Sequence, residues 1–171
     1  MNTVHTLQEY VDALRAAGIL TGCTAPEALL GRGVECLTYD TRTLRENALF
    51  ICKGAHFKEE YLRDALSRGA FAYVAEQQHD VDAPCILVSD IRYSLVVLGQ
   101  LFFDHVTDKL TSVGITGTKG KSTTAYYVRY ILNDWLRAEN KPKCAVLSSI
   151  DNYDGKVSEE SHITTPEVLE L

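Results

Sequence analysis

The stretch GITGTKGKSTT, residues 114–124, carries the pattern that decides how this chain is interpreted. An apolar run leads into it and predicts a β-strand over 110–116. Its glycines allow the backbone to turn sharply, and a helix is predicted to begin just behind the last of them. The N–H groups of such a loop point toward a common centre and can bind a chain of phosphates. The sequence therefore predicts a site for a nucleoside triphosphate.

The end of this stretch supplies the side chains that phosphate chemistry needs. Lys121 is predicted to reach the terminal phosphates and to be the catalytic residue of the loop. The hydroxyl of Ser122 is predicted to ligate Mg²⁺. The predicted phosphate-binding residues are Gly117, Thr118, Lys119, Gly120, Lys121, Ser122 and Thr123.

The glycine spacing departs from the two best-known nucleotide-binding patterns. The strict P-loop and the dinucleotide fingerprint both require glycine where this chain has Ile115. What remains is G-x-x-G-x-x-G-K-S, followed by a helix. The predicted inner face of that helix is Ala125, Val128, Leu132 and Trp135. The alternative interpretation is a glycine-rich turn that caps this helix without binding a ligand.

The composition limits the classes of partner. The chain has 171 residues, of which 46% are hydrophobic and 23% charged, as in ordinary globular proteins. Its formal net charge of −6 argues against a general binder of nucleic acid or of membrane surfaces. No apolar run approaches the roughly 18 residues that cross a bilayer, and the start is polar, so we expect a cytoplasmic protein. The five cysteines show no CxxC spacing, and we predict reduced thiols, buried where they lie in apolar strands.

The residues before the glycine-rich loop show alternating helix and strand patterns. Thr6 and Glu9 form a capping-box pattern for a first helix that stops at Gly18. Asp90 is well placed to cap the last helix of this part. The predicted strands are 34–39, 48–54, 71–76 and 85–90, and the later predicted helices are 59–69 and 91–104.

The predicted fold class is α/β. Alternating strands and helices form βαβ units with a mostly parallel sheet. We predict a small N-terminal α/β domain over 1–108 and the start of a parallel α/β domain of P-loop type over 109–171. The second part offers only two predicted strands, 110–116 and 143–149, and one full helix. Because this is too little to bury both faces of a parallel sheet, we expect a domain that is truncated.

Two further segments, together with the phosphate loop, resemble one known protein family. Residues 39–76 resemble the N-terminal domain of the Mur ligases, in which an Asp-Ser-Arg-type turn precedes a strand, a Lys-Gly, a helix and a second strand. The loop resembles the ATP loop of the same family, with Lys119 in place of the usual asparagine. HITTPEVLEL, residues 162–171, is similar to the Thr-Thr-Pro segment of the family members that add the third peptide residue.

The resemblance implies an activity. ATP with Mg²⁺ phosphorylates the terminal carboxylate of UDP-N-acetylmuramoyl-L-Ala-D-Glu, and the amine of lysine or diaminopimelate attacks the acyl phosphate. The first domain is then a UDP-substrate domain, and the second is the start of an ATP-binding domain. The resemblance places the amino-acid site and much of the catalytic site outside this chain, so we expect no ligation by the chain alone.

The resemblance also assigns substrate-binding residues in the first domain. Thr41 and Arg42 match the UDP-binding turn, with threonine in place of the usual serine. Gly54 and His56 match a loop near the uracil. The plainer alternatives are a solvated turn around Asp40 and an exposed loop histidine at position 56.

Near the end of the chain, Thr164 and Thr165 match contacts to the diphosphate and sugar of the substrate. Ile163 stands where many relatives carry asparagine, which puts one neighbouring contact in doubt. The alternative for this segment is a helix N-terminus, with Thr165 as the cap and Pro166 in the first turn.

Two rival functions remain open. A related ATP-dependent ligase, such as a folylpolyglutamate or cyanophycin synthetase, would share the loop but lack the DTR and TTP segments. Alternatively, the chain is a non-catalytic module that binds UDP-sugar peptides or nucleotides, or an interaction domain. The histidines at 5, 79, 105 and 162 show no ligand pattern, and we expect them at the surface.

Overall fold

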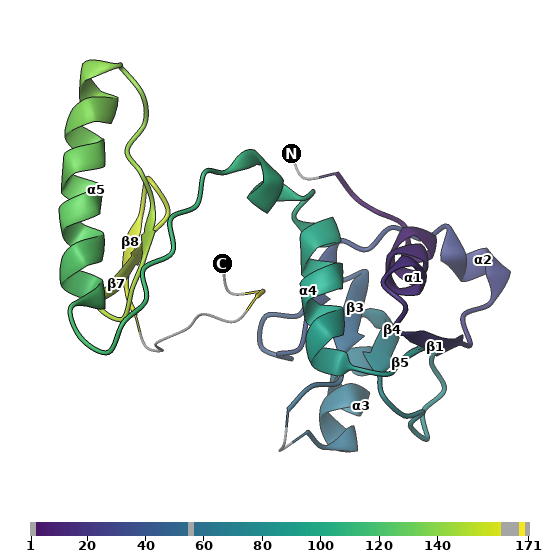
Figure 1. The fold of residues 1–171 in the computed structure, drawn as a ribbon. Coiled ribbons are helices and arrows are strands. Elements are labelled where there is room, and N and C mark those ends of the chain that lie inside the picture. The colour runs from purple at the N-terminus through teal and green to yellow at the C-terminus, as the bar shows by residue number, and fades with distance from the viewer. Residues whose placement is uncertain (1–2, 55–56, 162–167, 170–171) are drawn as a thin grey trace. The chain divides into compact units, whose positions relative to one another are not determined.

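A computed structural model describes residues 3–54, 57–161 and 168–169. The chain divides into two compact units, Met1–Leu110 and Thr111–Leu171. Within the described residues, the first unit holds a five-stranded sheet packed between helices, and the second holds one long helix beside a three-stranded sheet (Figure 1).

The sheet of the first unit is mostly parallel, as predicted. Its strands are β1 (Leu20–Cys23), β2 (Cys36–Thr38), β3 (Ala48–Ile51), β4 (Ala70–Ala75) and β5 (Cys85–Val88), in the order β1-β5-β4-β3-β2. Strands β2 to β5 pair in parallel, and β1 adds to β5 as an antiparallel edge strand. Because β2 and β3 are parallel neighbours, the segments that follow them leave the sheet at the same edge.

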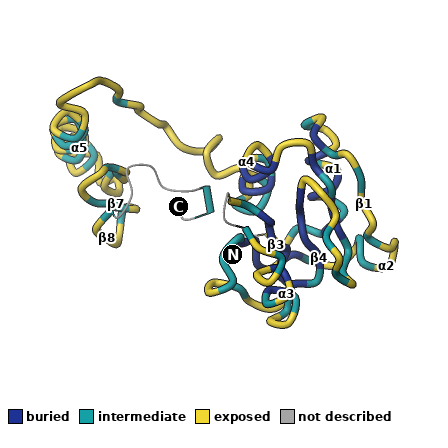
Figure 2. The backbone as a smooth tube through the Cα atoms, turned by 90° about the horizontal axis from the view of Figure 1, so that it is seen from below, coloured by how far each residue is buried: buried dark blue, intermediate teal, exposed yellow. Residues whose placement is uncertain are grey.

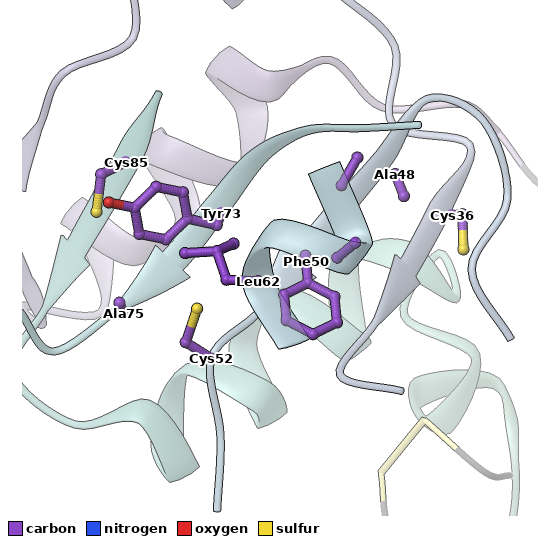
Figure 3. Packing of buried hydrophobic residues seen from close by; sticks show 10 residues of the cluster. Cys36, Ala48, Phe50, Cys52, Leu62, Tyr73, Ala75 and Cys85 are labelled. Carbon is purple, nitrogen blue, oxygen red and sulfur yellow. The ribbon is translucent and has the colours of Figure 1, made fainter. Parts of the chain in front are cut away.

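Helices cover both faces of this sheet. They are α1 (Leu7–Ala16), α3 (Glu59–Ser67) and α4 (Ile91–Phe102). The short helix α2 (Glu27–Leu30) contacts α1, and the 3-10 helix η1 (Val106–Lys109) follows α4. Helix α3 packs on one side, and α1 and α4 pack together on the other (Figures 1 and 2). Figure 3 shows Phe50, Leu62 and Tyr73 gathered in the core beneath α3. Alternation along the strands turns Leu49 and Val74 toward α1 and α4.

The predicted helix signals of this unit are confirmed. The Thr6 side chain accepts from the Glu9 N–H, and the Glu9 carboxylate accepts from the Thr6 N–H at 2.7 Å, which completes the capping box. Asp90 caps α4, and Gly69 follows α3 in the left-handed region at φ 114°. Strand β1 and helix α2 were not predicted, because the stretch 19–38 is short of regular apolar periodicity.

The second unit differs from the prediction. Helix α5 (Lys121–Ala138) lies beside β6 (Val146–Leu147), β7 (Asp151–Tyr153) and β8 (Ser158–Glu160), which form an antiparallel sheet. The predicted strand over 110–116 is wrong: this segment makes no β-ladder with any described residue, and Val113 is 65% exposed. A strand needs a hydrogen-bonded neighbour, and β6, which the sequence predicted as a longer strand over 143–149, pairs with β7 instead.

The predicted inner face of α5 is also wrong at two positions. Leu132 is 37% exposed and Trp135 is 53% exposed. The face that contacts the sheet carries polar side chains at helical spacing, namely Ser122, Tyr126, Arg129 and Asn133. Figure 2 shows no buried residue among the described part of this unit, and polar contacts join its helix to the sheet at this face.

The cysteine prediction is confirmed for the core. All five thiols are free, and Cys36, Cys52 and Cys85 are buried, whereas Cys23 is exposed. Burial raises the pKa of the Cys85 thiol, so it stays protonated and inert. Among the helices that the structure describes, none combines the length and the apolar character that crossing a bilayer requires.

The capping box gives a first prediction about stability. Thr6→Ala removes the hydroxyl that accepts from the Glu9 N–H, and we expect the free energy of unfolding to fall by about 1 kcal/mol. Urea denaturation at pH 7 measures this difference. Thr3→Ala, at an exposed position ahead of the helix, serves as the control and should leave the midpoint unchanged.

The same pair predicts a pH dependence. Hydrogen bonds from the side chain of His5, then from Thr6, lower the pKa of Glu9 from its ordinary 4.5 to about 2. A lowered carboxylate pKa stabilises the fold above pH 4.5, and this contribution is lost as the pH falls toward 2. The loss of unfolding free energy that Thr6→Ala causes should therefore be smaller in acid. An equal loss of unfolding free energy at pH 7 and pH 2 would show that the bond between the Thr6 hydroxyl and the Glu9 carboxylate does not stabilise the cap.

Candidate nucleotide and substrate sites

The glycine-rich loop reaches α5 through two glycines in unusual backbone conformations. Gly117 has φ 151° and Gly120, the N-cap residue of α5, has φ 79°. A Cβ at Gly120 would meet no atom within 4 Å, so the backbone conformation, not the available space, requires glycine there. The left-handed turn at Gly120 lets Lys121 begin the helix directly behind the loop.

The first turn of α5 begins without a side-chain acceptor for its amide hydrogens. Among the described residues no side chain accepts from the first amides of this helix, and its first turn contains no acidic residue. Helix α4 is different: Asp90 accepts from the N–H groups of Arg92 and Tyr93, and Glu76 accepts from the N–H of Ile91 at 3.0 Å. Free amides and the positive end of the helix dipole together make the start of α5 suited to an anion.

Lys121 lies over this loop. Its ammonium group donates a hydrogen bond to the carbonyl oxygen of Gly117 at 2.7 Å, so the side chain folds back across the turn. A lysine held there by one neutral acceptor can exchange this contact for a phosphate oxygen, which is the stronger, charge-assisted partner.

A hollow of about 500 Å³ opens beside the loop. Its lining consists of Ile115, Gly120, Lys121, Ser122, Thr123, Ala125, Leu147, Ser148 and Ser149. The structure thus brings four of the predicted phosphate-binding residues together around one space. Gly117, Thr118 and Lys119 lie in the loop ahead of α5 and do not line the hollow.

The far wall of this hollow was missed by sequence reasoning. The hydroxyl oxygens of Ser122 and Ser149 are 3.3 Å apart, so the second serine faces the predicted Mg²⁺ ligand. Ser148 and Ser149 directly follow β6, and residues at the ends of strands commonly supply ligand contacts in α/β folds. The two serines at the end of the predicted strand 143–149 were therefore the sequence signal that could have indicated this part of the site.

A second hollow, of about 510 Å³, lies at the edge of the first unit where β2 and β3 end. Its lining consists of Tyr39, Asp40, Thr41, Arg42, Lys53, Gly54, Phe57 and Tyr61. The predicted substrate residues Thr41, Arg42 and Gly54 therefore share one space, because parallel neighbouring strands deliver both segments to the same edge. His56, Thr164 and Thr165 lie outside the described residues.

The turn at Asp40 is closed by its own side chains. The Asp40 carboxylate accepts from the Arg42 N–H at 2.9 Å and from the Arg42 guanidinium, whose Nη2 lies 2.6 Å from Oδ2. This bonding to Arg42 holds the pKa of the Asp40 carboxyl below its usual range. The Arg42 side chain stays 87% exposed, and Thr41, between Asp40 and Arg42 in the sequence, lines the same hollow. A cation and a hydroxyl here suit a ligand that carries phosphates.

The prediction that His79 lies at the surface is wrong. His79 has only 13% of its side chain exposed. Its ring centroid lies 5.2 Å from that of Phe57, and its backbone N–H donates to the Tyr73 hydroxyl at 3.1 Å. His5 is also mostly buried, at 12%, whereas His105 is exposed as expected and His162 is outside the described residues.

Comparison with known proteins identifies relatives over most of the chain. No family model matches. The chain is 41% identical over 150 residues to UDP-N-acetylmuramoyl-L-alanyl-D-glutamate--L-lysine ligase of Enterococcus faecalis. The aligned stretch covers 86% of this chain and 29% of that protein. It is 43% identical over 136 residues to the protein of the same name from Streptococcus thermophilus, covering 79% of this chain and 27% of the relative.

The chain belongs to the Mur ligase family.

Solved Mur ligases share the fold of this chain. A structure of UDP-N-acetylmuramoyl-L-alanyl-D-glutamate--2,6-diaminopimelate ligase superimposes with a TM-score of 0.61 over 98% of this chain, at 18% identity and 32% of that chain's length. MurF from Acinetobacter baumannii gives a TM-score of 0.58 over 78% of this chain and 28% of its own, at 20% identity. The chain therefore spans less than a third of the length of these Mur ligases.

Proposed function

We propose that this chain carries the UDP-substrate domain and the ATP loop of a MurE-type ligase, an ATP-dependent carbon–nitrogen ligase of peptidoglycan precursor synthesis. The proposed reaction adds the third residue to UDP-N-acetylmuramoyl-L-Ala-D-Glu by way of an acyl phosphate. The observation that carries the proposal is the match at about 40% identity to L-lysine ligases through both sites. The names of these relatives favour lysine over diaminopimelate as the amino acid.

The residues at the start of α5 fit ATP and Mg²⁺. The uncapped amides and Lys121 offer hydrogen-bond donors and positive charge to the β- and γ-phosphates. The Ser122 hydroxyl is a hard oxygen ligand of the kind that Mg²⁺ prefers, and it borders the same hollow. When bound, Mg²⁺ neutralises phosphate charge; the loop orients the nucleotide, and Lys121 stabilises the charge that develops during transfer.

The edge of the first unit fits the uridine diphosphate end of the substrate. Thr41 presents a hydroxyl, Arg42 an exposed guanidinium, and Gly54 a backbone at φ 110° with no atom within 4 Å of its missing Cβ. The Asp40 carboxylate keeps the guanidinium oriented, so a diphosphate would meet a pre-formed cation. We extend the proposal to His56, Thr164 and Thr165 on the family resemblance alone.

The nucleotide site is tested by removing the ammonium group. Lys121→Ala should weaken binding of ATP·Mg²⁺ by about 10- to 100-fold, the loss expected for one charge-assisted hydrogen bond. Isothermal titration calorimetry of the 171-residue chain measures this. Lys156→Ala, an exposed lysine outside the hollow, is the matched control and should bind like the unaltered chain. Equal affinities for all three proteins would contradict the role of the loop.

The substrate site is tested by an isosteric change. Thr41→Val removes the hydroxyl without changing the side-chain volume, so UDP-N-acetylmuramoyl-L-Ala-D-Glu should bind about 5- to 20-fold more weakly while ATP affinity stays unchanged. Thr107→Val, at an exposed position of η1, is the control. If Thr41→Val binds the UDP-sugar normally, the assignment of this turn is wrong.

The two titrations also separate the rival functions. Binding of both ligands supports the ligase. Binding of the UDP-sugar without ATP would indicate a non-catalytic recognition module, and binding of neither would indicate an interaction domain.

A further inference from the structure

The turn that joins β6 to β7 is tied to the helix of the phosphate loop. The hydroxyl of Tyr126, one helical turn beyond Ser122, donates to the carboxylate of Asp151, and it lies 3.5 Å from the Ser148 hydroxyl. The second carboxylate oxygen of Asp151 accepts from the Ser158 hydroxyl on β8 at 3.1 Å. A single carboxylate therefore joins α5 to two strands of the sheet.

The same turn is closed internally by Ser148. Its hydroxyl accepts from the N–H groups of Ile150 and Asp151 at 3.1 and 3.2 Å, and it donates to the Asp151 carbonyl at 3.0 Å. The backbone adds a bond from the Ser148 N–H to the Asp151 carbonyl. Ser149 projects from this closed turn, so the position of its side chain follows from where Asp151 is held.

A serine that ligates a cation needs its proton directed elsewhere. The lone pair of the Ser122 hydroxyl must face the metal, and the O–H bond must then point at an acceptor. The Ser149 hydroxyl oxygen, 3.3 Å away, is such an acceptor on the wall of the same hollow. Hydrogen-bond partners of this kind orient metal ligands and raise metal affinity.

We propose that Tyr126 and Asp151 form a clamp that holds the Ser148–Asp151 turn against α5, so that Ser149 orients the hydroxyl of Ser122. Tyr126, Asp151 and Ser149 are positioning residues, which act on the nucleotide only through Ser122. This inference rests on the proposed function, because it gives Ser122 the role of Mg²⁺ ligand. It goes beyond the proposed function by giving Tyr126, Asp151 and Ser149, which lie outside the binding loop, a role in positioning Ser122.

The first arm of the test needs no ligand. In ¹⁵N-labelled chain without nucleotide, Tyr126→Phe and Asp151→Asn should each shift the amide resonances of Ser148 and Ser149, because both changes release the same turn. Tyr130→Phe removes a hydroxyl from an exposed position of the same helix and should leave these resonances unmoved. Unchanged Ser149 resonances in both clamp variants would overturn the proposal.

The second arm measures ATP affinity by calorimetry, once with Mg²⁺ and once with EDTA. Ser149→Ala should weaken binding about tenfold with Mg²⁺ and leave the EDTA value unchanged, since only the metal ligand is affected. Tyr126→Phe should show a smaller loss of the same kind. The double variant should bind no more weakly than Ser149→Ala, because both act through one hydroxyl.

The outcomes separate the two proposals. Equal losses with Mg²⁺ and with EDTA, or additive losses in the double variant, would overturn the clamp as a positioning device. An unaltered chain that binds no ATP under either condition would instead overturn the proposed nucleotide site, while the resonance shifts would still decide whether the clamp holds Ser149.

Discussion

The fold of the second unit leaves the start of α5 without a side-chain acceptor from any residue that the structure describes. Every helix begins with amide hydrogens that its own turns cannot satisfy. In α1 and α4 the chain satisfies them with Thr6, Glu76 and Asp90, whereas α5 follows Gly120 with no cap and no acidic residue in its first turn. Lys121 adds a further positive charge at that point. In the proposed function an anion from outside completes this helix end, and the hollow beside it gives such a partner room.

The proposed substrate site of the first unit depends on a different constraint, the direction of its strands. Because β2 and β3 run in parallel as neighbours, the Asp40–Arg42 turn and the Lys53–Gly54 segment leave the sheet together. Buried residues of β2 and β3 pack in the core, and two segments well apart in the sequence form one lined space. The Asp40–Arg42 bonding then fixes the orientation of the guanidinium.

The sequence predicted those parts of the structure whose signal is local. The capping box at Thr6, the cap at Asp90 and the parallel strands each arise from a few neighbouring residues, and each was found. The errors lie where the structure depends on distant partners. Residues 110–116 have the composition of a strand but no neighbouring strand among the described residues. Helix α5 turns Tyr126, whose hydroxyl bonds to Asp151, to its sheet, whereas Leu132 is exposed. Ser149 was missed for the same reason, since only the fold brings it to Ser122.

The most direct test of the central claim is a crystal structure of the chain with Mg²⁺ and a non-hydrolysable ATP analogue. The account predicts phosphate oxygens within hydrogen-bond distance of the N–H groups of residues 120–123. It also predicts that the Lys121 ammonium leaves the Gly117 carbonyl for the phosphates, and that the Ser122 hydroxyl meets the metal. An analogue bound elsewhere, with Lys121 still bonded to Gly117 and the first turn of α5 without an anion, would contradict the account.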